Sequence, residues 1–260
     1  MIKYIGSKRR LVPVLGEICS AVGARTAVDL FTGTTRVAQE FKRRGAYVTA
    51  VDTARYSEVF AQCYIGVDGQ SVDQSELDDA LIDLSARPDV DGYVTQTFCR
   101  DSRFFQPHNG RRVDAIRDAI ERDYRGTWLY PVLLTSLIEA ADRVDSTTGV
   151  QMAYVKQWAA RSYRPLQLRV PELLAGAGRA VRGTGVWDQP HQGPSGPSRT
   201  SNRAVVLPSD HNAATRKGAE GARAVSAGND QGAKGATLAL RQFLRPARVL
   251  GHDASGSTGR

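Results

Sequence analysis

The feature that most constrains the fold is a pair of short apolar segments that each reach an aspartate. Residues 26–31 contain Asp29, and residues 46–51 lead directly into Asp52. Between the segments, Gly33 allows a tight turn, and the residues after it place apolar side chains at helical spacing. This order predicts a strand, a turn, a helix and a second strand parallel to the first, joined by a right-handed crossover.

A ligand site is expected where these two strands end, because open parallel sheets bind ligands beyond their carboxyl ends. Asp52 could accept hydrogen bonds from both hydroxyls of a ribose. A nicotinamide cofactor would favour a GxGxxG turn for its pyrophosphate, but this turn has a single glycine, Gly33. S-adenosylmethionine lacks a pyrophosphate, and Asp29 could face its ammonium group. A purely structural role, in which both acids cap helices, also fits these residues.

The first ten residues combine an aromatic side chain, a glycine and a group of adjacent cations. Tyr4 and Gly6 precede Lys8, Arg9 and Arg10, which lead into a segment with helical spacing of apolar residues. Cations at a helix N-terminus are unfavourable for that helix, so they indicate either a bound anion or a solvated basic end.

The charge of the chain favours a polyanionic partner. The formal charge is +8 and the pI is near 9.6, and clustered Lys and Arg residues gain counterion-release free energy on a phosphate backbone. Residues 184–260 hold ten basic and five acidic residues, so much of the excess lies there. A basic tail that only aids solubility would explain the same charge.

The middle of the chain is predicted to be helical. Residues 73–84, 113–120 and 127–141 carry apolar side chains at helical spacing. Between the first two, residues 98–112 mix four arginines and three phenylalanines around a turn signal, Asn109-Gly110. Interleaved aromatic and guanidinium groups suit phosphate contact and base stacking, although an ordinary loop packed on a core has the same composition.

The composition also indicates the environment of the protein. Cys19, Cys63 and Cys99 lie far apart, without a CxxC pair or a histidine at ligand spacing, which predicts free buried thiols and no metal site. No apolar stretch approaches the roughly 18–20 residues that span a bilayer. We therefore expect a soluble, cytoplasmic protein with no membrane partner.

Several of these segments, in this order, resemble one family. They are Lys3–Arg9, Asp29–Gly33 and Val51-Asp52, followed by residues 109–117 and 140–150. Together they are similar to the DNA adenine methylase family, whose members are adenine-specific N6 DNA methyltransferases. The resemblance covers roughly residues 1–183.

The resemblance implies a fold and a domain order. The fold class is α/β, with an incomplete Rossmann-like sheet of the S-adenosylmethionine-dependent methyltransferase kind and a helical insertion. Residues 1–60 would form the cofactor half, and residues 61–175 the helical DNA-recognition insertion. Residues 176–260 would be a degenerate, largely disordered tail, since the part from residue 184 on is rich in glycine and proline and poor in apolar side chains.

The resemblance also implies site residues. S-adenosylmethionine would be held from the N-terminal segment, by the turn after the first strand, and at its ribose by the end of the second. Double-stranded DNA would be contacted by the N-terminal segment and the middle of the chain. The cofactor residues are Tyr4, Gly6, Lys8, Asp29, Phe31, Gly33 and Asp52, and the DNA residues are Arg9, Asn109, Arg111 and Arg112. Thr35 is a departure, because many members have a second glycine there.

The catalytic motif of the family is absent from this sequence. Members have Asp-Pro-Pro-Tyr shortly after the position of Gly183, where the acid and a proline carbonyl hold the adenine amino group. The nearest fragment, Trp187-Asp188-Gln189-Pro190-His191, lacks the second proline and the aromatic residue. We therefore assign no catalytic residue, and expect a shifted reading frame or a degenerate end after residue 183 and no sheet partners for the first two strands.

The sequence thus predicts a site-specific, adenine-specific DNA methyltransferase of a restriction-modification system that is monomeric and inactive as written. A non-catalytic DNA-binding remnant is the first alternative. A nicotinamide oxidoreductase is the second, and the turn with one glycine argues against it.

Overall fold

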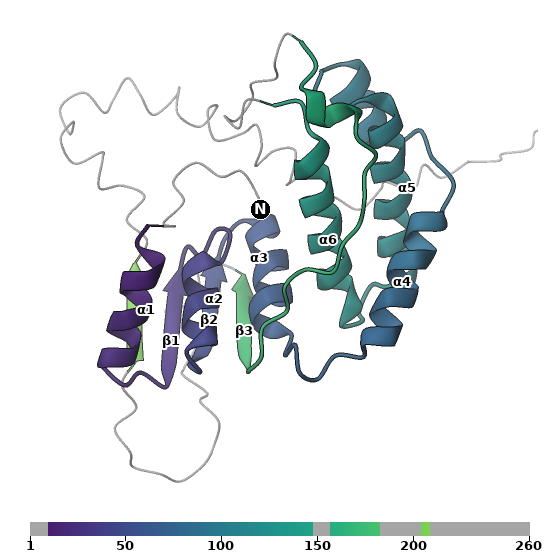
Figure 1. The fold of residues 1–260 in the computed structure, drawn as a ribbon. Helices are drawn as coiled ribbons and strands as arrows, with labels where there is room; N and C mark the ends of the chain where they lie inside the picture. The colour runs from purple at the N-terminus through teal and green to yellow at the C-terminus, as the bar shows by residue number, and fades with distance from the viewer. Residues whose placement is uncertain (1–9, 148–156, 183–203, 209–260) are drawn as a thin grey trace, which may run out of the picture.

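The computed structural model describes residues 10–147, 157–182 and 204–208, and these contain a small parallel sheet with helices (Figure 1). The strand order is β3-β2-β1-β4, and all three neighbouring pairs are parallel. The predicted strand-turn-helix-strand unit is therefore confirmed, with α2 between β1 and β2. The strands are β1 (Thr26–Leu30), β2 (Tyr47–Asp52), β3 (Gly178–Arg182) and β4 (Ala204–Pro208).

The helices fall into two groups. The first group accompanies the sheet, and α1 packs against α2 while α3 packs against β2 and β3. It comprises α1 (Val12–Ala21), α2 (Arg36–Arg43), α3 (Arg55–Ala61) and the π-helix η1 (Gln62–Gly66). The second group forms the helical part of the molecule, with α4 (Gln74–Ala86), the π-helix η2 (Thr95–Arg100), α5 (Pro107–Asp123), α6 (Leu129–Val144) and the 3-10 helix η3 (Ala160–Tyr163).

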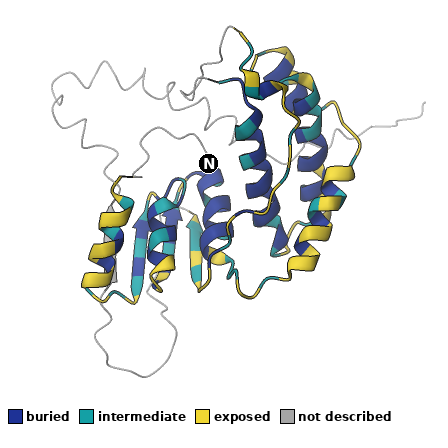
Figure 2. Ribbon diagram, viewed as in Figure 1, coloured by how far each residue is buried: buried dark blue, intermediate teal, exposed yellow. Residues whose placement is uncertain are grey.

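One apolar core runs from the sheet into the helical part. Phe41 of α2 and Phe60 of α3 are fully buried near the sheet, and Ile116 of α5 and Leu133 of α6 are buried between the helices. Figure 2 shows the inner faces of α3, α5 and α6 as buried, whereas α1 and α4 turn an exposed face outward. Because α3 contacts both the sheet and α6, it connects the two groups.

The predicted lack of sheet partners for the first two strands is wrong. β3 pairs with β2 and β4 pairs with β1, and both lie within residues 176–260. Strand β3 is short and contains two arginines, so its composition does not resemble a buried strand. It fits because a Cβ on Gly178 would lie 2.6 Å from Cγ2 of Ile65, so only glycine allows this approach. Residues 183–203 and 209–260 lie outside the described part.

The predicted turn at Asn109-Gly110 is also wrong, because α5 already begins at Pro107. Proline suits the first turn of a helix, where its missing N–H group has no partner to lose. Gly110 serves close packing instead of a turn, since a Cβ there would collide with Sγ of Cys99 and lie 3.2 Å from Cα of Thr95. Helix packing therefore explains this glycine.

The three cysteines are free and buried, as the sequence predicts. Within the described residues, no helix has the length and apolar character needed to cross a bilayer.

Because of this burial, we expect the native thiols to resist alkylation. Burial raises the pKa of Cys63 and of Cys99 to about 12, and it also raises the pKa of Cys19. At pH 8 the thiolate fraction of Cys63 and Cys99 would be about a thousandfold below that of an exposed thiol. Reaction with a thiol reagent, followed by absorbance, should be slow in the native protein and rapid in urea. Rapid labelling of Cys63 or Cys99 in the native protein would contradict this packing.

Candidate functional site

The turn between β1 and α2 holds an unusual backbone. Gly33 has φ +56°, and the flanking Phe31 and Thr35 have φ +57° and +60°. Glycine adopts this left-handed region at no steric cost, whereas other residues lose about 1–2 kcal/mol each. Phe31 is also 56% exposed. Two such residues persist only where surrounding contacts enforce the shape, and turns of this kind are concentrated at functional sites.

Asp29 supplies one of those contacts. It is 2% exposed, and its Oδ2 accepts hydrogen bonds from Oγ1 of Thr32 at 2.7 Å and from the N–H of Ala38 at 3.2 Å. Ala38 lies in the first turn of α2, where N–H groups lack helical partners, so the carboxylate caps this helix. The structural alternative considered from the sequence therefore describes Asp29 well.

Asp52 ties the same turn to the end of β2. Its Oδ2 accepts a hydrogen bond from the N–H of Gly33 at 2.9 Å, and its Oδ1 accepts one from the N–H of Ala54 at 2.8 Å. A second link joins the N–H of Thr32 to the carbonyl of Val51 at 3.0 Å. Asp52 is half-buried. Since a carboxylate has about four acceptor positions, these two bonds leave it able to accept further hydrogen bonds from a ligand.

Thr35 occupies the place of the second glycine without opening the turn. It is fully buried, its Oγ1 donates to the carbonyl of Thr34 at 2.7 Å, and it accepts from Nε2 of Gln39 at 2.8 Å. These bonds offset part of the cost of its left-handed backbone. The predicted cofactor residues Tyr4, Gly6 and Lys8, and the predicted DNA residue Arg9, lie outside the described residues.

Asn109 is buried rather than presented at the surface. Its Nδ2 donates to the carbonyls of Ser162 at 3.0 Å and Arg164 at 2.9 Å, and its Oδ1 accepts from the N–H of Leu166 at 2.9 Å. The side chain is 0% exposed. All three bonds go to alternate residues of one backbone segment, so Asn109 positions that segment and has no surface through which to contact DNA itself.

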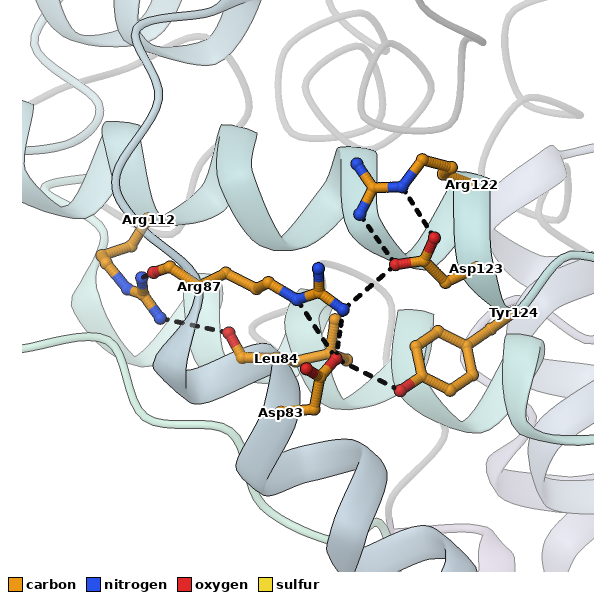
Figure 3. A network of polar contacts seen from close by, with 7 residues as sticks. All are labelled: Asp83, Leu84, Arg87, Arg112, Arg122, Asp123 and Tyr124. Carbon is orange, nitrogen blue, oxygen red and sulfur yellow. Dashed lines mark hydrogen bonds and ion pairs between the residues drawn. The ribbon is translucent and has the colours of Figure 1, made fainter.

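Arg112 is likewise committed to the protein (Figure 3). Its Nη2 donates to the carbonyls of Ser85 at 2.8 Å and Leu84 at 3.3 Å, and its Nη1 donates to the carbonyl of Arg87. These groups belong to the end of α4, which the guanidinium caps. Arg111 is different, since its side chain is 39% exposed and its ion pair with Asp89 is long, at 3.7 Å.

The same network joins α4 to α5. Arg87 contacts Asp83 at 2.6 Å and Asp123 at 3.2 Å, and the hydroxyl of Tyr124 lies 3.5 Å from Asp83. Figure 3 shows Arg87 between the two carboxylates, with Arg122 on the far side of Asp123. Some of the arginines that make the chain basic therefore serve to pack helices together.

The sequence pattern did not single out Lys42, which lies on the inner side of α2. It is 2% exposed, and its Nζ donates to the carbonyls of Tyr64, Ile65 and Val67 at 3.1, 3.0 and 2.6 Å. Burial lowers the pKa of this ammonium group. Lys42 therefore holds the end of η1. The sequence around it gave no signal that this lysine is buried.

The middle segment has a similar hidden anchor in Asp114. Its carboxylate accepts hydrogen bonds from the N–H groups of Gly92, Val94 and Thr95, and from Oγ1 of Thr95. This fixes the start of η2 against α5. The described residues contain no group of three or more side chains suited to hold a metal ion.

Comparison with known proteins identifies the family. Residues 4–178 match the family model of D12 class N6 adenine-specific DNA methyltransferases. The chain belongs to this family. The match includes both strand ends, the turn between them, and the helical part, so the predicted family resemblance is confirmed.

Individual relatives agree with this membership. The chain is 33% identical over 180 residues to the type II methyltransferase M.NlaIII of Neisseria lactamica, covering 64% of this chain and 53% of that protein. It is 32% identical over 188 residues to the modification methylase StsI of Streptococcus sanguinis, covering 65% and 28%. It is also 32% identical over 169 residues to M.CviAII of Paramecium bursaria Chlorella virus 1, covering 60% and 50%.

The match covers only part of each of those proteins. The chain spans about half the length of M.NlaIII and M.CviAII and a smaller share of StsI. No solved structure matches it.

We expect Asn109→Ala to destabilise the fold by about 3 kcal/mol, because each buried backbone group left without a partner costs about 1–3 kcal/mol. Equilibrium urea unfolding followed by circular dichroism measures this change. Asp118→Ala, on the exposed face of the same helix, is the matched control, with an expected change below about 0.5 kcal/mol. A loss below about 1 kcal/mol for Asn109→Ala would contradict its role as an anchor.

Proposed function

We propose that this chain is the cofactor-binding and DNA-binding part of an adenine-specific N6 DNA methyltransferase of a restriction-modification system. The observation that supports this most is the braced turn at the carboxyl ends of β1 and β2, with Asp52 partly exposed beside Gly33. The sheet would be the Rossmann-like sheet of a methyltransferase, and the protein a cytoplasmic monomer.

The residues at the turn fit S-adenosylmethionine. The carboxylate of Asp52 retains acceptor positions for ribose hydroxyls, and Phe31 and Gly33 would lie along the methionine side of the cofactor. Asp29 would hold the shape of that side, since its carboxylate already caps α2. Tyr4, Gly6 and Lys8 would complete the site from the N-terminal segment. When bound, S-adenosylmethionine supplies the methyl group, and the single-glycine turn suits it because it carries no pyrophosphate.

Double-stranded DNA would bind along the helical part. Arg111 is suited to phosphate contact by its exposure, together with Arg9 of the N-terminal segment. Asn109 and Arg112 would contribute indirectly by fixing the segments around them. Clustered cations of this kind favour a phosphate backbone without selecting a sequence.

Methyl transfer would need groups that hold the adenine amino group, and the sequence lacks the Asp-Pro-Pro-Tyr segment that does so in the family. We therefore propose that this chain binds its ligands but transfers no methyl group by itself. The alternative is a remnant that binds DNA alone. Binding of S-adenosylhomocysteine separates the two, since only the first requires an intact cofactor site.

We expect calorimetry to detect S-adenosylhomocysteine binding to the full chain. Asp52→Ala should weaken binding at least tenfold, because about 1.5–3 kcal/mol is typical of a hydrogen bond to a charged group. Asp78→Ala, at an exposed position of α4, is the control and should bind as the parent does. A folded parent that binds no S-adenosylhomocysteine would refute the cofactor site and favour the DNA-binding remnant.

We also expect no transfer of labelled methyl groups from S-adenosylmethionine to DNA. The measurement is scintillation counting of duplex DNA after incubation with the full chain, with an active methylase of the family as the positive control. Incorporation above background would show that other residues hold the adenine and would overturn the proposed inactivity.

A further inference from the structure

Asn109 fixes a short segment, residues 159–166, that we name the clamped turn. The turn comprises η3 and the extended residues after it, and the three hydrogen bonds of Asn109 fall on Ser162, Arg164 and Leu166. Within the turn, both the N–H and the hydroxyl of Ser162 bond the carbonyl of Ala159, at 2.8 and 2.7 Å. The Asn109 side chain thus forms hydrogen bonds with the backbone of this segment, as a neighbouring strand does in a sheet.

Further bonds fasten the start of the clamped turn to two other loops. Arg161 donates to Oδ1 of Asp145 at 2.8 Å, and the N–H of Ala159 donates to Oγ of Ser146 at 3.1 Å. The N–H of Ser146 in turn donates to the carbonyl of Phe104 at 2.7 Å. Three loops that are distant in the sequence are therefore joined, and the turn is held along its length.

The held turn presents an aromatic ring and a positive charge to solvent. Tyr163 is 62% exposed, and Arg164 is exposed as well. No ion pair joins Arg164 to any residue in the described ranges, and residues 157–170 include three arginines and no acidic residue. Nearby, the guanidinium of Arg103 lies 4.9 Å from the centre of the Trp158 ring. Asn109 bonds the carbonyls on both sides of Tyr163, so the backbone is held while the ring itself lies largely in solvent.

The location agrees with a role toward the substrate. Figure 1 shows η3, in green, at the end of the helical part toward which the strands of the sheet point. The braced turn with Asp52 lies at those same strand ends. The clamped turn and the candidate cofactor site therefore open toward the same side of the molecule.

We propose, on the basis of the proposed function, that the clamped turn contacts DNA, with the ring of Tyr163 stacking on a base and Arg164 pairing with a phosphate. A base face becomes open to an aromatic ring wherever the DNA stack is locally opened, and an inserted side chain stabilises that opening. Such stacking is strong and tolerates any base, and a backbone that is already fixed loses little conformational freedom on binding. Asn109 is the positioning residue, since it fixes the backbone that carries both side chains.

Fluorescence anisotropy of the full chain with a labelled, mixed-sequence 30-base-pair duplex, in a salt series, tests this assignment. Tyr163→Ala should weaken binding about tenfold or more, whereas Tyr163→Phe, which keeps the ring, should bind within about twofold of the parent. Arg164→Ala should lower the slope of log affinity against log salt by about one. Tyr47→Ala and Arg25→Ala are the controls, since both residues are exposed where β2 and β1 begin, away from the proposed contact.

The possible results separate this inference from the proposed function. If the parent binds the duplex and Tyr163→Ala binds equally well, the stacking role is refuted while the DNA-binding function stands. If the folded parent binds no DNA even at low salt, both are refuted. Weakening by Tyr163→Ala and Tyr163→Phe alike would assign the contact to the hydroxyl and overturn stacking.

Discussion

The candidate site depends on two carboxylates that hold one turn at the ends of β1 and β2. Asp29, near the end of β1, accepts hydrogen bonds from Thr32 of the turn and from Ala38 in the first turn of α2. Asp52, at the end of the neighbouring strand β2, accepts one from Gly33. The turn needs this support because Phe31 and Thr35 both have a left-handed backbone. Hydrogen bonds to a charged acceptor are worth about 1.5–3 kcal/mol, enough to offset strain of about 1–2 kcal/mol per residue.

The helical part relies on the same principle at a larger scale. Asn109, Arg112 and Asp114 each bond several backbone groups of a segment distant in the sequence. Such a polar side chain supplies hydrogen-bond partners for backbone groups that would otherwise be buried without them. It can therefore hold an irregular loop that has no large apolar surface. The loops around η2 and η3 thus have defined shapes beside helices with an apolar core.

Much of the fold could be predicted because it depends on local patterns. The helices α4, α5 and α6 follow from apolar residues at helical spacing, and β1, α2 and β2 follow from two apolar segments separated by a glycine turn. The start of α5 could not be predicted from the Asn109-Gly110 signal, since packing against Cys99 decides it. Strand β3 could not be predicted either, because its pairing with β2 depends on the close approach of Gly178 to Ile65.

The sequence by itself determined the family, the first strand-turn-helix-strand unit, and the placement of Asp29, Gly33 and Asp52 around one turn. These follow from residue order and short spacings, which can be recognised without knowledge of distant contacts. Only the tertiary structure decided which polar residues face inward, so that Asn109 became an anchor and Tyr163 an exposed ring. The physical reason is that burial and hydrogen bonding of a side chain depend on segments far away in the chain, here residues 162–166 for Asn109.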